Sequence, residues 1–195
     1  MRVGRIALGV LVALLPLAIA VGALLAATGT YPWMLYPVLS DEVLYWHQAA
    51  TFRVVGFNGG YYTDYELTAP ASFSNYYAWG PFIPMVYGLA GRLMGWWGLS
   101  ALVMVNLAVF TLVWAGVLAA HRPRAGVLGL LALVLLTFPP YLMLSARSLT
   151  EVLHQAIGVG LAGGFYGVLT AAPGRAKWRA TGLLAIAILA VSMLR

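Results

Sequence analysis

The fold is decided by an uncharged run at Leu99–Ala120, which reads LSALVMVNLAVFTLVWAGVLAA. A helix of about 20 apolar residues rises about 30 Å and covers the hydrocarbon core of a bilayer. The whole chain has the same character: 63% of its 195 residues are hydrophobic and 8% are charged, whereas about a quarter of a soluble domain is charged. With a mean hydropathy of +0.90, the sequence predicts an all-α integral membrane protein. It excludes a soluble cytosolic enzyme and a disordered chain.

Apolar runs on both sides of this stretch predict four more helices in a single membrane domain. They cover Ile6–Ala27, Ala125–Leu144, Thr150–Thr170 and Ala180–Arg195. The last run offers about 15 apolar residues, or roughly 22 Å of helix, which is short of the bilayer core. We therefore expect either an unusually short last helix or, as we favour, a chain that is the N-terminal portion of a longer protein.

The first run has two interpretations. Basic Met1–Arg5 and the small residues of Ala23–Ala27 are typical of a secretory signal. However, the apolar run is about 22 residues long, beyond the 7–15 of a cleaved signal. We interpret it as a signal anchor.

The distribution of charge predicts how the chain is oriented. Basic residues concentrate on the cytoplasmic side of membrane proteins, and a cytoplasmic N-terminus collects most of them there. The inside set is Arg2, Arg5, Arg122, Arg124, Arg175, Lys177 and Arg179, and the outside set is Arg53, Arg92, Arg147 and Arg195. All five acids, Asp41, Glu42, Asp64, Glu66 and Glu151, then fall outside or at that boundary. Outside means the periplasm or cell exterior, or the endoplasmic reticulum lumen in a eukaryote. Basic residues scattered in this way do not indicate nucleic-acid binding.

A long outer loop follows the first helix. Gly29–Gly98 holds 18 of the 25 aromatic residues and is interrupted by Asn58-Gly59-Gly60. An aromatic belt at the lipid headgroups accounts for about half of them, and the excess predicts a small ordered cap on the membrane. Within the loop, Pro81–Trp97 is apolar enough to cross, but crossing would place the later basic residues outside. Its prolines, glycines and terminal Trp96–Trp97 pair favour a helix lying along the outer surface.

The first acidic feature is Asp41-Glu42. Ser40 is a good helix N-cap, and two acids in a first turn complement the helix dipole. Their other interpretation is functional, because acids near membrane depth are costly. Neighbouring Trp46 and His47 also favour desolvation, which raises the pKa of a carboxyl group.

The second acidic feature is Glu151, within RSLTEVLHQ at Arg147–Gln155. His154 shares its helical face, and Glu-x-x-His pairs ligate metals in some helical bundles. With three His and no Cys in the chain, a hydrogen bond or neutral packing is the alternative for His154. Small-xxx-small patterns from Gly160 to Gly167 predict close helix packing, and Pro139-Pro140 predicts a kink.

These features together resemble the C-type (GT-C) membrane glycosyltransferases of the protein O-mannosyltransferase and lipid A aminoarabinose transferase kind. The resemblance rests on four features of the chain. They are DEVLYWHQ soon after the first span, a large outer loop with membrane-parallel helices, GPFIPMVYGLAGRLMGWWG at Gly80–Gly98, and Ser148–Glu151 at the start of a later span. Together they cover nearly the whole chain, although each motif is short.

The resemblance implies transfer of a sugar from a polyprenyl-phosphate donor to an acceptor hydroxyl at the outer face, with inversion. Asp41 would be the general base. Glu42 and Glu151 would orient the acceptor or, with Asp41, hold a divalent metal ion. Arg147 would face the donor phosphate, with Arg53, Arg92 and Arg195 as further candidates. The remaining candidate substrate-binding residues are aromatic groups with polar tips, Tyr45, Trp46, His47 and His154.

Two other functions stay open. A channel or transporter expects strongly polar residues within its spans, and Leu99–Ala120 offers only Ser100, Asn106 and Thr111. A non-catalytic membrane scaffold or subunit, with the aromatic cap as its binding surface, fits the same residues. The few polar residues in the spans disfavour the channel, nothing in the sequence excludes the scaffold, and the resemblance favours the transferase.

Overall fold

The computed structural model describes residues 2–56, 82–145, 147, 150–170 and 174–192, and every regular element within these ranges is a helix. In chain order they are α1 (Arg2–Thr28), the 3₁₀ turn η1 (Pro32–Met34), α2 (Ser40–Val55), α3 (Phe82–Met94), α4 (Ala101–His121), α5 (Ala125–Thr137), α6 (Pro139–Leu144), α7 (Glu151–Thr170) and α8 (Arg175–Ser192). Asp64, Glu66, Arg195, the Asn58-Gly59-Gly60 stretch and much of the predicted aromatic cap lie outside the described residues.

Three of these helices are long and apolar enough to cross a membrane. They are the Ala7–Thr28 part of α1, all of α4 and all of α7. The prediction of a helical membrane protein is confirmed at this level. α5 and the Ala180–Leu189 part of α8 are apolar but shorter. α8 begins at Arg175, earlier than the predicted Ala180, so its first turns carry basic residues.

The predicted helix Ala125–Leu144 is divided in two. Phe138 separates α5 from α6 with φ −83° and ψ 97°, and it directly precedes Pro139. The ring of a proline disfavours the helical conformation of the residue before it. The predicted kink is therefore confirmed, and it is a complete break between two helices.

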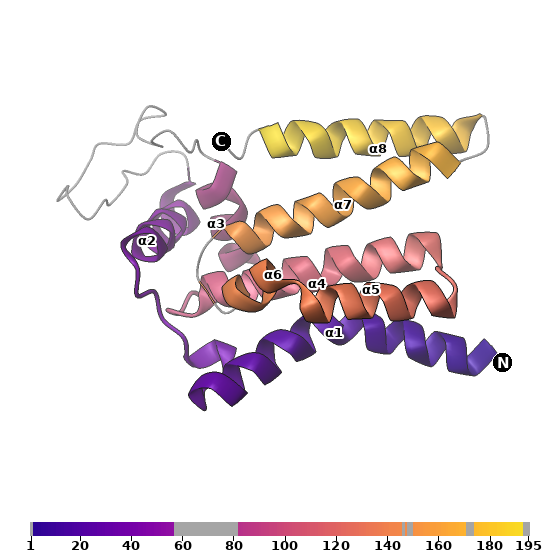
Figure 1. Ribbon diagram of the computed structural model, residues 1–195. Coiled ribbons are helices and arrows are strands. Elements are labelled where there is room, and N and C mark those ends of the chain that lie inside the picture. Colours follow the sequence, from indigo (N-terminus) through magenta and orange to yellow (C-terminus); the bar gives the residue numbers. More distant parts are fainter. Residues whose placement is uncertain (1, 57–81, 146, 148–149, 171–173, 193–195) are drawn as a thin grey trace.

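α4 is the central helix of the bundle, with α1 and α7 packed against it, α5 beside α1 and α8 beside α7 (Figure 1). A glycine stripe on α7 allows the α4–α7 contact. A Cβ added at Gly163 would lie 2.8 Å from Cγ2 of Val117, and one added at Gly160 would lie 3.4 Å from Val113. His121 Nε2 also donates a hydrogen bond to the Gly163 carbonyl over 2.9 Å. The predicted packing through small residues is confirmed for this stripe.

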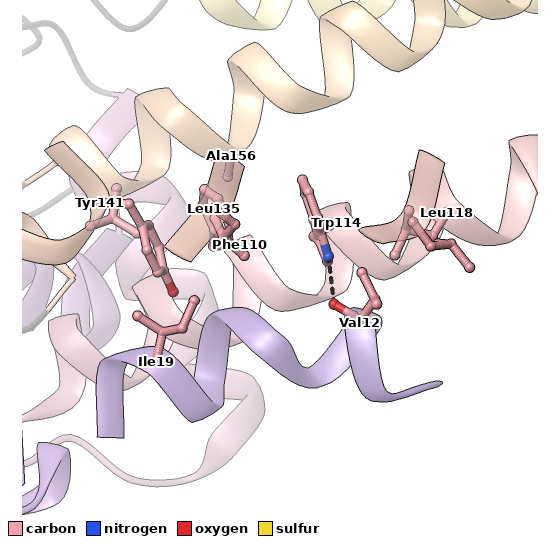
Figure 2. Close-up of a cluster of buried hydrophobic side chains, with 10 residues drawn as sticks. Val12, Ile19, Phe110, Trp114, Leu118, Leu135, Tyr141 and Ala156 are labelled. Carbon is pink, nitrogen blue, oxygen red and sulfur yellow. Dashed lines mark hydrogen bonds between the residues drawn. The ribbon is translucent and has the colours of Figure 1, made fainter. Parts of the chain in front are cut away.

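Pro16 lies inside α1 and removes one hydrogen bond from it. Because proline has no N–H, the carbonyl four residues earlier, that of Val12, loses its helical partner. Trp114 of α4 replaces it: its indole Nε1 donates to Val12 O over 2.8 Å (Figure 2). The hydroxyl of Tyr141 donates to Pro16 O over 2.8 Å. Two side chains from other helices thus satisfy the backbone of α1 within the hydrophobic core that contains Val12 and Phe110.

The two ends of the bundle differ in charge. The α4–α5 connection, the end of α7 and the start of α8 lie at the same end as the start of α1, whereas α2, α3 and α6 lie at the other (Figure 1). The first end carries Arg122, Arg124, Arg175, Lys177 and Arg179. The described acids, Asp41, Glu42 and Glu151, lie in α2 and at the start of α7, at the second end. The charge segregation seen in the sequence therefore runs along the helix bundle.

Candidate functional site

The acidic end of the bundle begins with α2, whose first turn is fixed by Glu42. This side chain is 2% exposed, and its Oε2 accepts hydrogen bonds from the backbone N–H groups of Val38 (2.8 Å) and Leu39 (3.0 Å). The predicted N-cap, Ser40, is wrong by one residue: Leu39 is the cap and Ser40 is already helical. The Glu42 carboxylate reaches back over the N-terminus and satisfies donors there. Its observed contacts therefore hold the helix start that carries Asp41.

α2 and α3 pack together as a compact pair. A Cβ added at Gly88 would lie 2.9 Å from the backbone N of Arg53 and 3.0 Å from Ala49 O, so only glycine permits this approach. The guanidinium of Arg92 donates to the carbonyls of Phe52 (3.4 Å), Arg53 and Val54 (3.3 Å) at the end of α2. A cation at a helix C-terminus also complements the dipole. Arg92, a further candidate for the donor phosphate, is thus engaged by the backbone of α2.

The α2–α3 pair is anchored to the spanning helices. Tyr45 and Ala49 of α2 and Ile83 of α3 share a buried hydrophobic cluster with Leu102 of α4 and Leu153 of α7. Trp46 Nε1 donates to the carbonyl of Gly98, just before α4, over 2.9 Å. This packing brings the start of α2 to the start of α7.

The charges of both acidic features act on Tyr45. Burial raises the pKa of its phenol above the usual value of 10.0, the negative charge of Asp41 raises it further, and that of Glu151 adds a smaller increase. A hydrogen bond with the side chain of Thr150 acts in the opposite direction and lowers this pKa. A charge shifts a neighbouring pKa only when it lies close by. Asp41 and Glu151, far apart in sequence, therefore both lie within electrostatic range of one phenol.

A second buried tyrosine links three elements at the same place. The hydroxyl of Tyr87 in α3 donates to Oδ1 of Asn106 in α4. The Nδ2 of Asn106 donates to the backbone carbonyl of Arg147, between α6 and α7, over 3.5 Å. Burial raises the pKa of Tyr87, and the charge of Glu151 adds to the increase. The polar chain Tyr87–Asn106–Arg147 therefore holds the backbone of Arg147, four residues before Glu151.

Two buried amide atoms, one from each of two glutamines near these residues in sequence, have no hydrogen-bond partner in the described part of the chain. They are Nε2 of Gln48, one helical turn after Tyr45, and Oε1 of Gln155, one turn after Glu151. An unsatisfied buried donor or acceptor costs about 1–3 kcal/mol. Neither residue was predicted from the sequence. Their helical spacing from the acids, two turns after Asp41 and one turn after Glu151, is the signal that could have identified them.

The predicted site residues differ in exposure. Asp41, Glu151, Arg147 and His154 are exposed, Trp46 and His47 are half-buried, and Tyr45 is buried. The His47 ring meets the Trp46 ring edge-on, with centroids 5.2 Å apart. Exposure leaves the Asp41 and Glu151 carboxylates accessible to a substrate. The sequence predicted that Trp46 and His47 would shield Asp41 from water, but its side chain is exposed.

His154 makes a local hydrogen bond. Its Nδ1 lies 2.8 Å from the carbonyl oxygen of Thr150, and because a carbonyl only accepts, this nitrogen carries the proton. The backbone N–H of His154 donates to the same oxygen over 3.0 Å. Within the described ranges, no group of three or more His, Asp and Glu side chains is placed to hold a metal ion. The hydrogen-bonded alternative for His154 thus has direct geometric support.

The candidate site is thus centred on Tyr45, which hydrogen-bonds Thr150 and is within electrostatic range of Asp41 and Glu151, at the acidic end of the bundle. Arg147, Gln48 and Gln155 are close to these residues in sequence. Comparisons of the chain with protein-family models, with curated proteins and with solved structures give no match.

Proposed function

We propose that this chain is a GT-C-like membrane glycosyltransferase that moves a sugar from a polyprenyl-phosphate donor to an acceptor hydroxyl, with inversion at the anomeric carbon. The observation that carries the proposal is that the charges of both Asp41 and Glu151 act on the buried Tyr45 phenol. Two exposed carboxylates that are far apart in sequence but act on one buried polar group support a composite site. Acids that only cap two separate helices need not act on the same group.

In the proposed reaction Asp41 is the general base. Its carboxylate takes the proton of the acceptor hydroxyl, the acceptor oxygen forms a bond to the anomeric carbon, and the bond from that carbon to the donor phosphate breaks. The leaving polyprenyl phosphate keeps the bonding electrons. Glu151 accepts a hydrogen bond from the acceptor or the sugar and orients it. Any divalent metal ion that assists would be held by Asp41 and Glu151, since Glu42 is engaged by backbone N–H groups.

Arg147 is the cation assigned to the donor phosphate. Its backbone is held on both sides, because its N–H donates to Leu144 O over 2.9 Å and its carbonyl accepts from Asn106. An arginine on an anchored backbone presents a fork of donors that matches phosphate oxygens. Sugar hydroxyls both donate and accept hydrogen bonds. They would therefore suit the unpartnered Nε2 of Gln48, a donor, and the unpartnered Oε1 of Gln155, an acceptor.

The proposed activity also requires a particular position of the chain in the membrane. α1, α4 and α7 span it, the α5–α6 pair and α8 complete five crossings, and the basic end of the bundle faces the cytoplasm. The site then lies at the outer face, where α2 and α3 rest on the membrane surface. A lipid-linked donor reaches this position from the bilayer, with its phosphate at headgroup level.

Binding and turnover are tested separately, because one does not require the other. The first probe is a short-chain polyprenyl phosphate, the leaving group common to every such donor. We expect Arg147→Gln to weaken its binding about tenfold, the effect of one charge-assisted hydrogen bond. Arg124→Gln, a matched loss of charge at the other end of the bundle, should leave binding unchanged.

Turnover is followed as release of polyprenyl phosphate from polyprenyl-phosphate-linked mannose by the chain in liposomes, with the hydroxyl of added glycerol or of water as the acceptor. Asp41→Asn should retain binding and fold but lose turnover by about 10²–10⁴-fold, the usual contribution of a general base. Equal turnover by Asp41→Asn and the unsubstituted chain contradicts the assignment of the base. If the chain does not bind the polyprenyl phosphate, the scaffold interpretation replaces the enzyme.

A further inference from the structure

The basic end of the bundle holds a groove that the proposed function does not use. It has a volume of about 680 Å³ and lies between α1, α4 and the start of α5. Its apolar wall is formed by small or aliphatic residues: Gly9, Val10, Ala13, Ala115, Ala119 and Leu128. This volume falls within the range of pockets that enclose drug-sized ligands. The groove is thus large enough for an extended apolar chain.

Charge at the mouth of the groove indicates what occupies it. Arg122 lines the groove, whereas Arg124, two residues later in the same connection, does not. The described acids all lie at the other end of the bundle (Figure 1). An apolar slot with arginine at its end matches an acyl chain attached to an anionic headgroup.

The backbone at Arg122 is unusual in a way that fits this role. Its φ is 44° and its ψ is 56°, and it is the only non-glycine residue with positive φ in the described part of the chain. A left-handed conformation costs an ordinary residue roughly 1–2 kcal/mol, and such strain is concentrated at ligand sites. Glycine or asparagine would be the relaxed choice for ending α4 here. At this position the chain therefore carries an arginine that lines the groove, in place of the relaxed glycine or asparagine.

We propose that this groove binds one acyl chain of an anionic glycerophospholipid, with Arg122 contacting the phosphate of its headgroup. The site lies at the opposite end of the bundle from the Asp41–Glu151 cluster, and it does not depend on the proposed transferase activity. The bound lipid acts as a structural ligand that fills the space between α1, α4 and the start of α5.

The experiment measures lipid retained by the purified chain in detergent, by native mass spectrometry. The probes are phosphatidylglycerol and phosphatidylcholine with the same acyl chains. We expect one phosphatidylglycerol to be retained per chain, in preference to phosphatidylcholine by about tenfold, the worth of one charge-assisted contact. Equal retention of the two lipids overturns the role of Arg122.

Two variants with matched controls test the groove itself. Gly9→Leu fills it without a clash, because a Cβ at Gly9 meets nothing within 4 Å. Gly116→Leu is its control, since Gly116 is equally open and lies outside the groove. Gly9→Leu should lower retention of both lipids about tenfold, the effect of displacing about two buried methylene groups. Gly116→Leu should not.

Arg122→Asn removes the charge. Asparagine is chosen because it tolerates the left-handed conformation of this residue. It should abolish only the preference for phosphatidylglycerol, whereas Arg124→Asn should keep it. Unchanged retention in Gly9→Leu, or equal losses in Gly9→Leu and Gly116→Leu, overturns the proposal. A dimer mass that Gly9→Leu abolishes also overturns it and assigns the groove to a second copy of the chain.

Discussion

The indole of Trp114 hydrogen-bonds the carbonyl of Val12, the group that Pro16 leaves without its helical partner, over 2.8 Å (Figure 2). In water such a carbonyl is solvated. In the core of a membrane helix bundle it has no other donor, so a side chain must supply one. This contact is a specific link between the first spanning helix and the central one.

Removal of the indole donor should destabilise the bundle. Trp114→Phe keeps an aromatic ring but leaves Val12 O unpaired, and we expect the free energy of unfolding to fall by about 1–3 kcal/mol. Sodium dodecyl sulfate titration of the detergent-solubilised chain measures it. Pro16→Ala provides the control, because it restores an N–H that donates to the same carbonyl. In that background the effect of Trp114→Phe should shrink, and an undiminished effect would show that packing, not the hydrogen bond, is lost.

The glycine stripe on α7 predicts a position-specific loss of stability. Gly163→Val places side-chain atoms where Val117 of α4 already lies, and we expect a loss of about 1–3 kcal/mol from overpacking. Gly158→Val changes helix propensity equally, but a Cβ at Gly158 meets nothing within 4 Å. The same titration, run on both variants, isolates the contact. Equal losses at the two positions would attribute the effect to helix propensity alone.

Local features were predictable from the sequence, and contacts across helices were not. The break before Pro139 and the packing of Gly163 follow from single residues whose backbone properties allow few alternatives. The segregation of charge in the sequence also placed Asp41 and Glu151 on the same side of the membrane. It did not indicate that both would act on Tyr45. Ser40 was misplaced as a cap because the carboxylate of Glu42 takes over the donors at the helix start.

The partners missed altogether are side chains whose roles depend on register between helices. Trp114 looked like one more apolar residue of a span, and Asn106 like an isolated polar one. Only the packed bundle places Trp114 opposite the carbonyl freed by Pro16, and Asn106 between Tyr87 and the backbone of Arg147. Helical periodicity predicts on which face of its helix a residue lies, but it does not predict which atom of a neighbouring helix the side chain contacts.

The pKa of the Tyr45 phenol reports the charges of both acidic features. Because its pKa in the folded chain is raised above 10.0, the stability that the protonated phenol contributes is fully present below about pH 10 and is lost as the pH rises through the folded-state value. Asp41→Asn should lower this pKa, Glu151→Gln should lower it less, and Thr150→Val should raise it. The measurement is tyrosinate absorbance against pH, after subtraction of the Tyr45→Phe curve.

A charge change at the other end of the bundle serves as the control for this titration. Arg124→Gln alters the net charge at the other end of the bundle and should leave the Tyr45 curve in place. If Asp41→Asn shifts the curve and Glu151→Gln does not, Glu151 lies too far from the phenol for the composite site. The proposed function would then lose its main support, whereas the lipid groove would be unaffected.

The proposed orientation predicts which end of the bundle faces the cell exterior. The sequence has no Cys, so a single introduced cysteine gives an unambiguous signal. The variants are Ser40→Cys and Arg124→Cys, both at exposed positions, at the acidic and basic ends respectively. Since basic residues are retained on the cytoplasmic side, a membrane-impermeant maleimide should label the Ser40→Cys variant in intact cells. It should label the Arg124→Cys variant only after permeabilisation. The reverse pattern would place the Asp41–Glu151 cluster in the cytoplasm, where an outer-face transferase site is impossible.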